Sequence, residues 1–336
     1  MISKDALIYR LIAPLLGGER TGYILSVLRI DPRLAGDGAV MSRAQYAMAL
    51  NAVLFSGLLD RVPTASAYVA EVLAEGRSVW FDHGALRTVD GPTGALPSGH
   101  AAFTRLLAPL GYVVGGLYLL PRLRMTGRAL VHRDLPECVP QFFVSELHVA
   151  QLPDEAQAAA GRVFGSSADP LGEIAWHALD LLAREGQCSL EEAQAALPGL
   201  VAAFGRQHET PALADYEILL AHSAEAAWIA TEGNAFNHAT DRVPDVAALA
   251  AELRARGMPL KADIEVSANG RVRQTALVAD KVARWFRSGD GSLVERIVPG
   301  SFYEFISRDI DPTTGRLDLS FDSGNATGIF AVTSAT

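Results

Sequence analysis

A run of short segments between residues 78 and 149 constrains the fold more than any other feature of this chain. Several stretches there are bounded by glycine and proline and are rich in aromatic and β-branched residues, which is typical of strands. These stretches are 78–89, 111–120, 127–132 and 141–149. A helical pattern at 100–110 interrupts them. The order of one strand, one helix and three strands predicts a βαβββ unit.

Helices are predicted on both sides of this unit. Before it, 44–59 follows the possible cap Ser42 and 65–75 follows Thr64. After it, the chain becomes alanine-rich, with helices predicted at 155–164, 170–184, 190–204 and 212–223. In the second of these, Asp169 is placed as the cap and Pro170 as the first helical residue.

A second, diverged half of the sheet is predicted after the helical segment, although the two halves share no convincing sequence repeat. Its elements are a strand at 226–232, a helix at 245–256 and strands at 275–279, 294–298, 303–307 and 328–332. The chain therefore reads as an α+β fold with N-terminal helices and a helical insertion. The expected divisions are 1–76, 77–152, 153–224 and 225–336.

Composition excludes several function classes. The formal charge of −9 argues against a nucleic-acid binder, which needs a basic surface to displace counterions. A small anionic substrate would require a local cluster of arginines instead. The candidates are Arg87 and the run Arg122, Arg124 and Arg128.

Neither a membrane segment nor a disulfide framework is expected. The longest apolar stretch, 111–120, contains three glycines, ends at Pro121, and is predicted to be a buried strand. The N-terminus lacks the pattern of a signal peptide. The two cysteines, Cys138 and Cys188, are interpreted as small buried residues of a protein in a reducing compartment. We therefore expect a cytoplasmic protein.

Three residues are potential metal ligands: His83, His238 and Glu304. Two imidazoles and one carboxylate form the facial triad that holds non-haem Fe(II). Their wide separation in sequence does not by itself indicate a site, because convergence has to come from the fold. Taken singly, each histidine is more readily interpreted as a structural residue than as a ligand. For Glu304 alone, a solvent-facing position and a ligand role are equally good interpretations.

Several neighbours of these residues are candidates for second-layer hydrogen bonds. Asn237 and Thr240 lie beside His238 and are expected to fix a ligand's tautomer. His148, close to Glu146, is kept as a further possibility.

The segments that carry these residues share one resemblance. The stretches 79–89, 233–240 and 300–306 resemble the 2-oxoadipate dioxygenase/decarboxylases, also called 2-hydroxyglutarate synthases. The stretches 121–127, 140–147 and 321–330 are similar to the family in the same way, so the resemblance spans most of the chain. The sequence departs from the family pattern at Asp241, where proline is expected.

This resemblance implies a fold and a reaction. The fold would be a half-open β-barrel similar to the vicinal oxygen chelate enzymes. The reaction would convert 2-oxoadipate and O2 to 2-hydroxyglutarate and CO2, a step of lysine degradation. His83, His238 and Glu304 would bind Fe(II), and Arg87 would hold a substrate carboxylate. Backbone groups near Val332 and Thr333 would add donors.

Other interpretations remain open at this stage. Arg87 could instead form a structural salt bridge to Asp82 or Asp90. The same ligands could hold a redox-inactive metal in a glyoxalase-type lyase or isomerase. A non-catalytic protein that binds an oxo acid or a metal is a third possibility. Oxygen consumption coupled to CO2 release would distinguish the dioxygenase from both alternatives.

Overall fold

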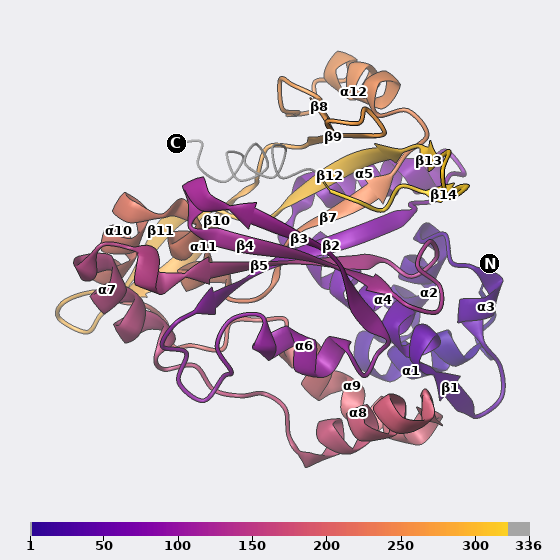
Figure 1. Cartoon of the computed structure of the whole chain (residues 1–336), viewed down its shortest axis with the longest axis horizontal. Coiled ribbons are helices and arrows are strands. Elements are labelled where there is room, and N and C mark those ends of the chain that lie inside the picture. Colours follow the sequence, from indigo (N-terminus) through magenta and orange to yellow (C-terminus); the bar gives the residue numbers. More distant parts are fainter. Residues whose placement is uncertain (1, 322–336) are drawn as a thin grey trace.

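An eight-stranded sheet forms the centre of the computed structural model, which describes residues 2–321 (Figure 1). The strand order is β3-β4-β5-β2-β7-β12-β9-β8. The strands are β2 (Phe81–Asp90), β3 (Tyr112–Leu120), β4 (Met125–His132), β5 (Gln141–His148), β7 (Phe236–Arg242), β8 (Glu265–Val266), β9 (Val272–Ala276) and β12 (Phe302–Arg308).

The sheet is built from two βαβββ units. The first consists of β2, helix α6 (Ala101–Leu107), β3, β4 and β5, with β2 parallel to β5. The second consists of β7, helix α12 (Val246–Ala255), β8, β9 and β12, with β7 parallel to β12. The units join through the antiparallel pair of β2 and β7. The βαβββ order predicted for residues 78–149 and the α+β half-barrel are therefore confirmed.

Two long helices cover one face of the sheet. Helix α4 (Arg43–Arg61) contacts β7, and α5 (Pro63–Ala74) contacts β12. Ser42 caps α4 as predicted, through a capping box with Gln45. The prediction that Thr64 caps α5 is wrong, because Pro63 already occupies the first helical position and Thr64 instead donates a hydrogen bond to Asp280.

The remaining helices surround the sheet. They are α1 (Leu7–Leu16), α2 (Gly18–Val27), α3 (Pro32–Ala35), α7 (Asp154–Phe164), α8 (Glu173–Glu185), α9 (Leu190–Ala202), α10 (Leu213–His222) and α11 (Ala224–Glu232). The predicted helical insertion separates into two pairs: α7 packs with α10 at one end of the sheet, whereas α8 and α9 lie near α1 (Figure 1). Strand β1 (Val40–Ser42) pairs with β6 (Gln187–Ser189) beside the second pair.

Two predictions for these segments are wrong: the start of one helix and the type of one element. Helix α8 begins at Glu173, so Asp169 and Pro170 lie before it, and Asp169 forms an ion pair with Arg105. The stretch 226–232 is helix α11 rather than a strand. Ser223 caps this helix by accepting a hydrogen bond from the backbone of Ala226, and burial on all sides gave it the apolar composition of a buried strand.

Strand β3 is an edge strand, not the buried strand expected from its apolar sequence. It pairs only with β4 in the described sheet, and Val114, Leu117 and Leu119 are 58%, 59% and 68% exposed. Composition alone does not distinguish an apolar edge strand from a central one.

The second unit contains an unpredicted insertion between β9 and β12. Strands β10 (Lys281–Arg287) and β11 (Leu293–Pro299) form a separate hairpin, and only β11 was anticipated. The short pair β13 (Ile310–Asp311) and β14 (Arg316–Leu317) follows β12, and two 3-10 turns lie at Pro121–Leu123 and Val149–Gln151. The strand predicted at 328–332 lies outside the described residues. None of the helices between residues 2 and 321 combines the length and apolar character that a membrane span requires.

Candidate metal centre

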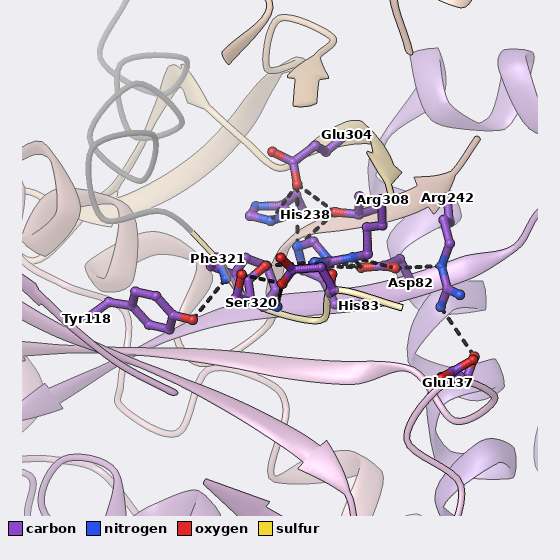
Figure 2. Close-up of polar contacts among 12 residues, drawn as sticks. Asp82, His83, Tyr118, Glu137, His238, Arg242, Glu304, Arg308, Ser320 and Phe321 are labelled. Atoms are coloured by element: carbon purple, nitrogen blue, oxygen red, sulfur yellow. Dashed lines mark hydrogen bonds and ion pairs between the residues drawn. The ribbon is translucent and has the colours of Figure 1, made fainter. Parts of the chain in front are cut away.

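The three predicted ligands converge in the structure. His83 lies on β2, His238 on β7 and Glu304 on β12, three strands that are adjacent in the sheet. One ligand atom from each lies within 4.8 Å of the other two, and all three residues are buried. Figure 2 shows Glu304 facing the two imidazoles. The sheet order, not local spacing, brings the three residues together.

The oxygen atoms of Glu304 have different surroundings. Glu304 Oε2 lies 3.4 Å from His83 Nε2 and 3.6 Å from His238 Nε2, and it accepts a hydrogen bond of 2.8 Å from Thr240. Its other oxygen, Oε1, is buried and has no hydrogen-bond partner in the described chain. A buried carboxylate oxygen without a partner is unfavourable by about 1–3 kcal/mol or more. A cation bound between the three side chains would contact Oε2, and it would satisfy Oε1 only if the carboxylate bound through both oxygens.

The charge states of two of the residues suit metal binding. Burial lowers the pKa of His238 to about 3, so its imidazole is neutral at physiological pH. Burial alone would raise the pKa of Glu304, but the two imidazoles and Thr240 outweigh it, and the pKa is lowered. A neutral imidazole and an ionised carboxylate are the forms that bind divalent metals.

A buried ion cluster orients His83. Asp82 Oδ1 lies 2.8 Å from His83 Nδ1, which directs Nε2 toward Glu304. Arg242 and Arg308 both donate hydrogen bonds to Asp82 (Figure 2). These arginines hold the pKa of Asp82 well below its usual range against the opposing effect of burial. Burial would lower the pKa of His83, but its bonds to Asp82 and Glu304 raise it.

The predicted second-layer residues are confirmed in part. Asn237 Nδ2 lies 3.2 Å from His238 Nδ1 as expected, whereas Thr240 Oγ1 contacts His83 Nε2 at 3.1 Å and Glu304 rather than His238. His148 was wrongly assigned to this layer, because it bonds Thr126 and Asp90 away from the ligands. The role of Asp82 was missed, although its position next to His83 was the available signal.

Arg87 lies on the same face of β2 as His83. Each lies two residues from Ala85, and successive side chains of a strand point to opposite faces of the sheet. Arg87 is fully buried, and its guanidinium lies 4.9 Å from the centre of the Trp228 ring. Burial lowers its pKa to about 10, so it remains a cation at neutral pH. The suggested partner Asp82 is held by Arg242 and Arg308 instead.

Other predicted residues are not brought to this centre. Arg128 forms a 2.6 Å ion pair with Glu146, and Arg124 donates to the backbone of His222. The proposed anion cluster with Arg122 is therefore not formed at the ligands. Neither cysteine belongs to the group: Cys188 is buried as expected, but Cys138 is only half-buried. Val332 and Thr333 lie outside the described residues.

Two further residues at the centre, Phe321 and Gln141, were not identified from the sequence. The Phe321 ring lies 4.8 Å from the His83 ring and 4.9 Å from the Phe143 ring. Arg308 donates to the carbonyl of Ser320, which places Phe321 there (Figure 2). Gln141 pairs with His83 in the β2–β5 register, and neither atom of its buried amide has a hydrogen-bond partner in the described structure.

Comparisons with known proteins agree with the resemblance seen in the sequence. The family model of the 2-oxoadipate dioxygenase/decarboxylases matches residues 56–317. A relative of that name from Arabidopsis thaliana is 26% identical over 224 residues, which cover 58% of this chain and 51% of the relative. This chain therefore spans about half the length of that relative in the match. A second relative, from Oryza sativa subsp. japonica, is 23% identical over 82% of this chain and 75% of its own length.

Solved structures share the fold. A glyoxalase superfamily protein from Ralstonia eutropha JMP134 is 52% identical, with a TM-score of 0.91 and coverage of 95% of this chain and 99% of its own. The hydroxyglutarate synthase from Oryza sativa, solved with 2-oxoadipate, is 22% identical with a TM-score of 0.67, covering 87% of this chain and 93% of its own. The vicinal-oxygen-chelate-like fold expected from the sequence is thus confirmed.

Proposed function

Because this chain belongs to the 2-oxoadipate dioxygenase/decarboxylase family, we propose that it converts 2-oxoadipate and O2 into 2-hydroxyglutarate and CO2. The observation that carries this proposal is the buried group of His83, His238 and Glu304 with Arg87 on the same face of the sheet. One molecule of each reactant gives one molecule of each product, so no second oxo acid is needed.

The donor set suits Fe(II). Two imidazoles and one carboxylate are the ligands of the non-haem iron facial triad, and Glu304 Oε2 lies 3.4 Å and 3.6 Å from the two imidazole Nε2 atoms. When bound, Fe(II) would supply the dioxygen chemistry of the reaction. His83, His238 and Glu304 are the residues that would hold it.

The surrounding residues have separate tasks in this proposal. Asp82 keeps a proton on His83 Nδ1, and Thr240 orients Glu304 through its hydroxyl. Arg87 binds a carboxylate of the substrate, since a guanidinium forms two parallel hydrogen bonds to such a group. Phe321 lies against His83 and limits the access of water from that side. Asp82, Thr240 and Arg87 thus act by positioning the ligands and the substrate.

A second candidate function has one observation in its favour. The relative from Ralstonia eutropha is described as a glyoxalase superfamily protein. In that case the same three side chains would hold a redox-inactive divalent metal, and substrate would be isomerised or cleaved without oxygen. A cytoplasmic location and a place in lysine degradation are part of the proposed dioxygenase function, not of this alternative.

Oxygen uptake tests the two functions directly. We expect the protein reconstituted anaerobically with Fe(II) to consume one O2 per 2-oxoadipate on exposure to air, with 2-hydroxyglutarate identified by mass. His83→Ala should lose this activity, whereas Glu295→Gln, a change on exposed β11, should keep it. Metal binding without oxygen uptake would exclude the dioxygenase reaction on 2-oxoadipate and favour the redox-inactive alternative.

A further inference from the structure

The first strands of the two βαβββ units carry a short internal repeat. Strand β2 contains Phe81, His83 and Arg87, and β7 contains Phe236, His238 and Arg242 at the same spacing. The repeat is too short to stand out in the sequence, which is why no repeat was expected there. In each unit the residue before the histidine contacts its Nδ1: Asp82 at 2.8 Å in the first and Asn237 at 3.2 Å in the second.

The pairing of these strands has the same symmetry. His83 pairs with Thr240, and His238 pairs with Ala85, so exchanging the two units maps one pair onto the other. The irregularities in the ladder, at Phe81 and at Leu86, are exchanged as well. His83 is therefore equivalent to His238, and Ala85 is equivalent to Thr240.

The last strands of the units extend this equivalence to Glu304. In the second unit Glu304 pairs with Thr240 on one side and with Ala276 on the other. In the first unit Phe143 pairs with Ala85 on one side and with Ala129 on the other. Phe143 therefore occupies the position in the first unit that Glu304 occupies in the second.

We propose that Phe143 stands at the position of a fourth ligand and keeps a second carboxylate out of the metal group. This inference rests on the proposed function, because it assumes that His83, His238 and Glu304 bind a metal. Two further rings accompany Phe143: Phe321 at 4.9 Å and Tyr118 at 5.7 Å between ring centres. The first unit thus presents a group of aromatic rings where the second presents a ligand.

The two positions differ in one supporting residue. Glu304 accepts a hydrogen bond from Thr240, whereas the equivalent neighbour of Phe143 is Ala85, which has no hydroxyl group. A carboxylate introduced at position 143 would thus lack this donor. A metal ion bound by the two histidines would give this carboxylate a partner in place of the missing donor.

A rescue experiment tests the equivalence with Co²⁺ as the probe and calorimetric affinity as the readout. We expect Glu304→Ala to weaken Co²⁺ binding by about 100-fold or more, because one of three ligands is lost. Adding Phe143→Glu should recover at least about tenfold of this affinity, since His83, His238 and the new carboxylate form the mirrored ligand set. The isosteric control Phe143→Gln in the same background should recover none.

Each outcome decides a different question. Equal Co²⁺ affinity for the Glu and Gln versions would overturn the role of Phe143 while leaving the proposed function intact. Failure of the unmodified protein to bind Co²⁺ would overturn the proposed function and this inference together. If circular dichroism shows that the double variant is unfolded, Phe143→Glu and Phe143→Gln are compared with Glu304 present. In that pair the Glu variant must bind Co²⁺ more tightly, and equal affinity overturns the inference.

Discussion

The two faces of the central sheet are built from alternate residues of the same strands, yet they differ in kind. On β12, Tyr303 and Phe305 belong to the main hydrophobic core, while Glu304 between them faces the two histidines. The covered face is mostly apolar and packs against α4 and α5. The other face carries the buried polar groups of the metal centre. One face therefore stabilises the fold, and the other uses that stability to hold groups that are unfavourable to bury.

The largest expected effect is on activity and comes from Glu304→Gln. The substitution keeps the size of the side chain but removes the charge that would hold the metal, so we expect turnover of 2-oxoadipate to fall by about 1,000-fold or more. The variant should still melt cooperatively, as followed by circular dichroism. A variant that retains most of its turnover would contradict the assignment of Glu304 as a ligand.

The neighbouring substitution Phe305→Ala should have the opposite effect: it should lower stability and leave metal binding unchanged. Phe305 is fully buried and packs 4.9 Å from Tyr68 of α5, so we expect a loss of about 3–5 kcal/mol in the free energy of unfolding. Leu119→Ala on exposed β3 is the control and should change it by less than about 0.5 kcal/mol. Metal affinity per folded molecule should be unchanged, and a selective loss of metal binding would break the separation of the two faces.

Asp241 gives the covered face a pH dependence. Burial raises its pKa to about 7, and it accepts hydrogen bonds from Tyr68 and from the backbone of Trp80. The unfolded pKa is about 4, so this group's contribution is fully present below that pH and is lost as the pH rises through 7. The expected slope is up to about 1.4 kcal/mol per pH unit.

Asp241→Asn should remove this slope, because the amide oxygen still accepts a hydrogen bond but does not titrate. Chemical denaturation of both proteins at pH 5 and pH 8 measures the difference. The variant should gain stability relative to the unmodified protein at the higher pH. Parallel pH profiles would show that Asp241 is ionised throughout. Asp241 thus connects β7 to α5 through its hydrogen bond with Tyr68.

Arg87→Lys should weaken substrate binding more than it slows the reaction. Lysine keeps the charge but not the paired hydrogen bonds, so we expect KM for 2-oxoadipate to rise about tenfold or more with a smaller change in kcat. Arg122→Lys, outside the metal centre, should leave both constants unchanged. A fall in kcat with unchanged KM would argue that Arg87 does not hold the ground-state substrate.

The smallest expected effect is that of Gln141→Met. Neither amide atom of Gln141 has a hydrogen-bond partner in the described chain, so replacing it with an apolar side chain of similar length should not lower the unfolding free energy of the metal-free protein. Gln45→Met is the comparison, because it breaks a capping box and should lower it by about 1 kcal/mol. A similar loss for Gln141→Met would show that its amide is satisfied in solution.

Elements with local signals could be predicted from the amino-acid sequence. Glycine and proline boundaries located the strands of the first unit, and Ser42 as a possible cap located the start of α4. Local pattern failed at 226–232, because a helix buried on all sides has the same composition as a buried strand. It also failed at β3, since an apolar sequence does not indicate whether a strand is central or at an edge.

Candidate ligands could be named from the sequence, but their convergence depends on long-range strand pairing. The resemblance of short segments to a family identified His83, His238 and Glu304, whereas their adjacency depends on the order β2-β7-β12. The support of His83 by Asp82, Arg242 and Arg308 joins residues far apart in the chain, which no local spacing encodes. The equivalence of Phe143 and Glu304 has the same origin: it follows from strand register, which is set by long-range backbone hydrogen bonds.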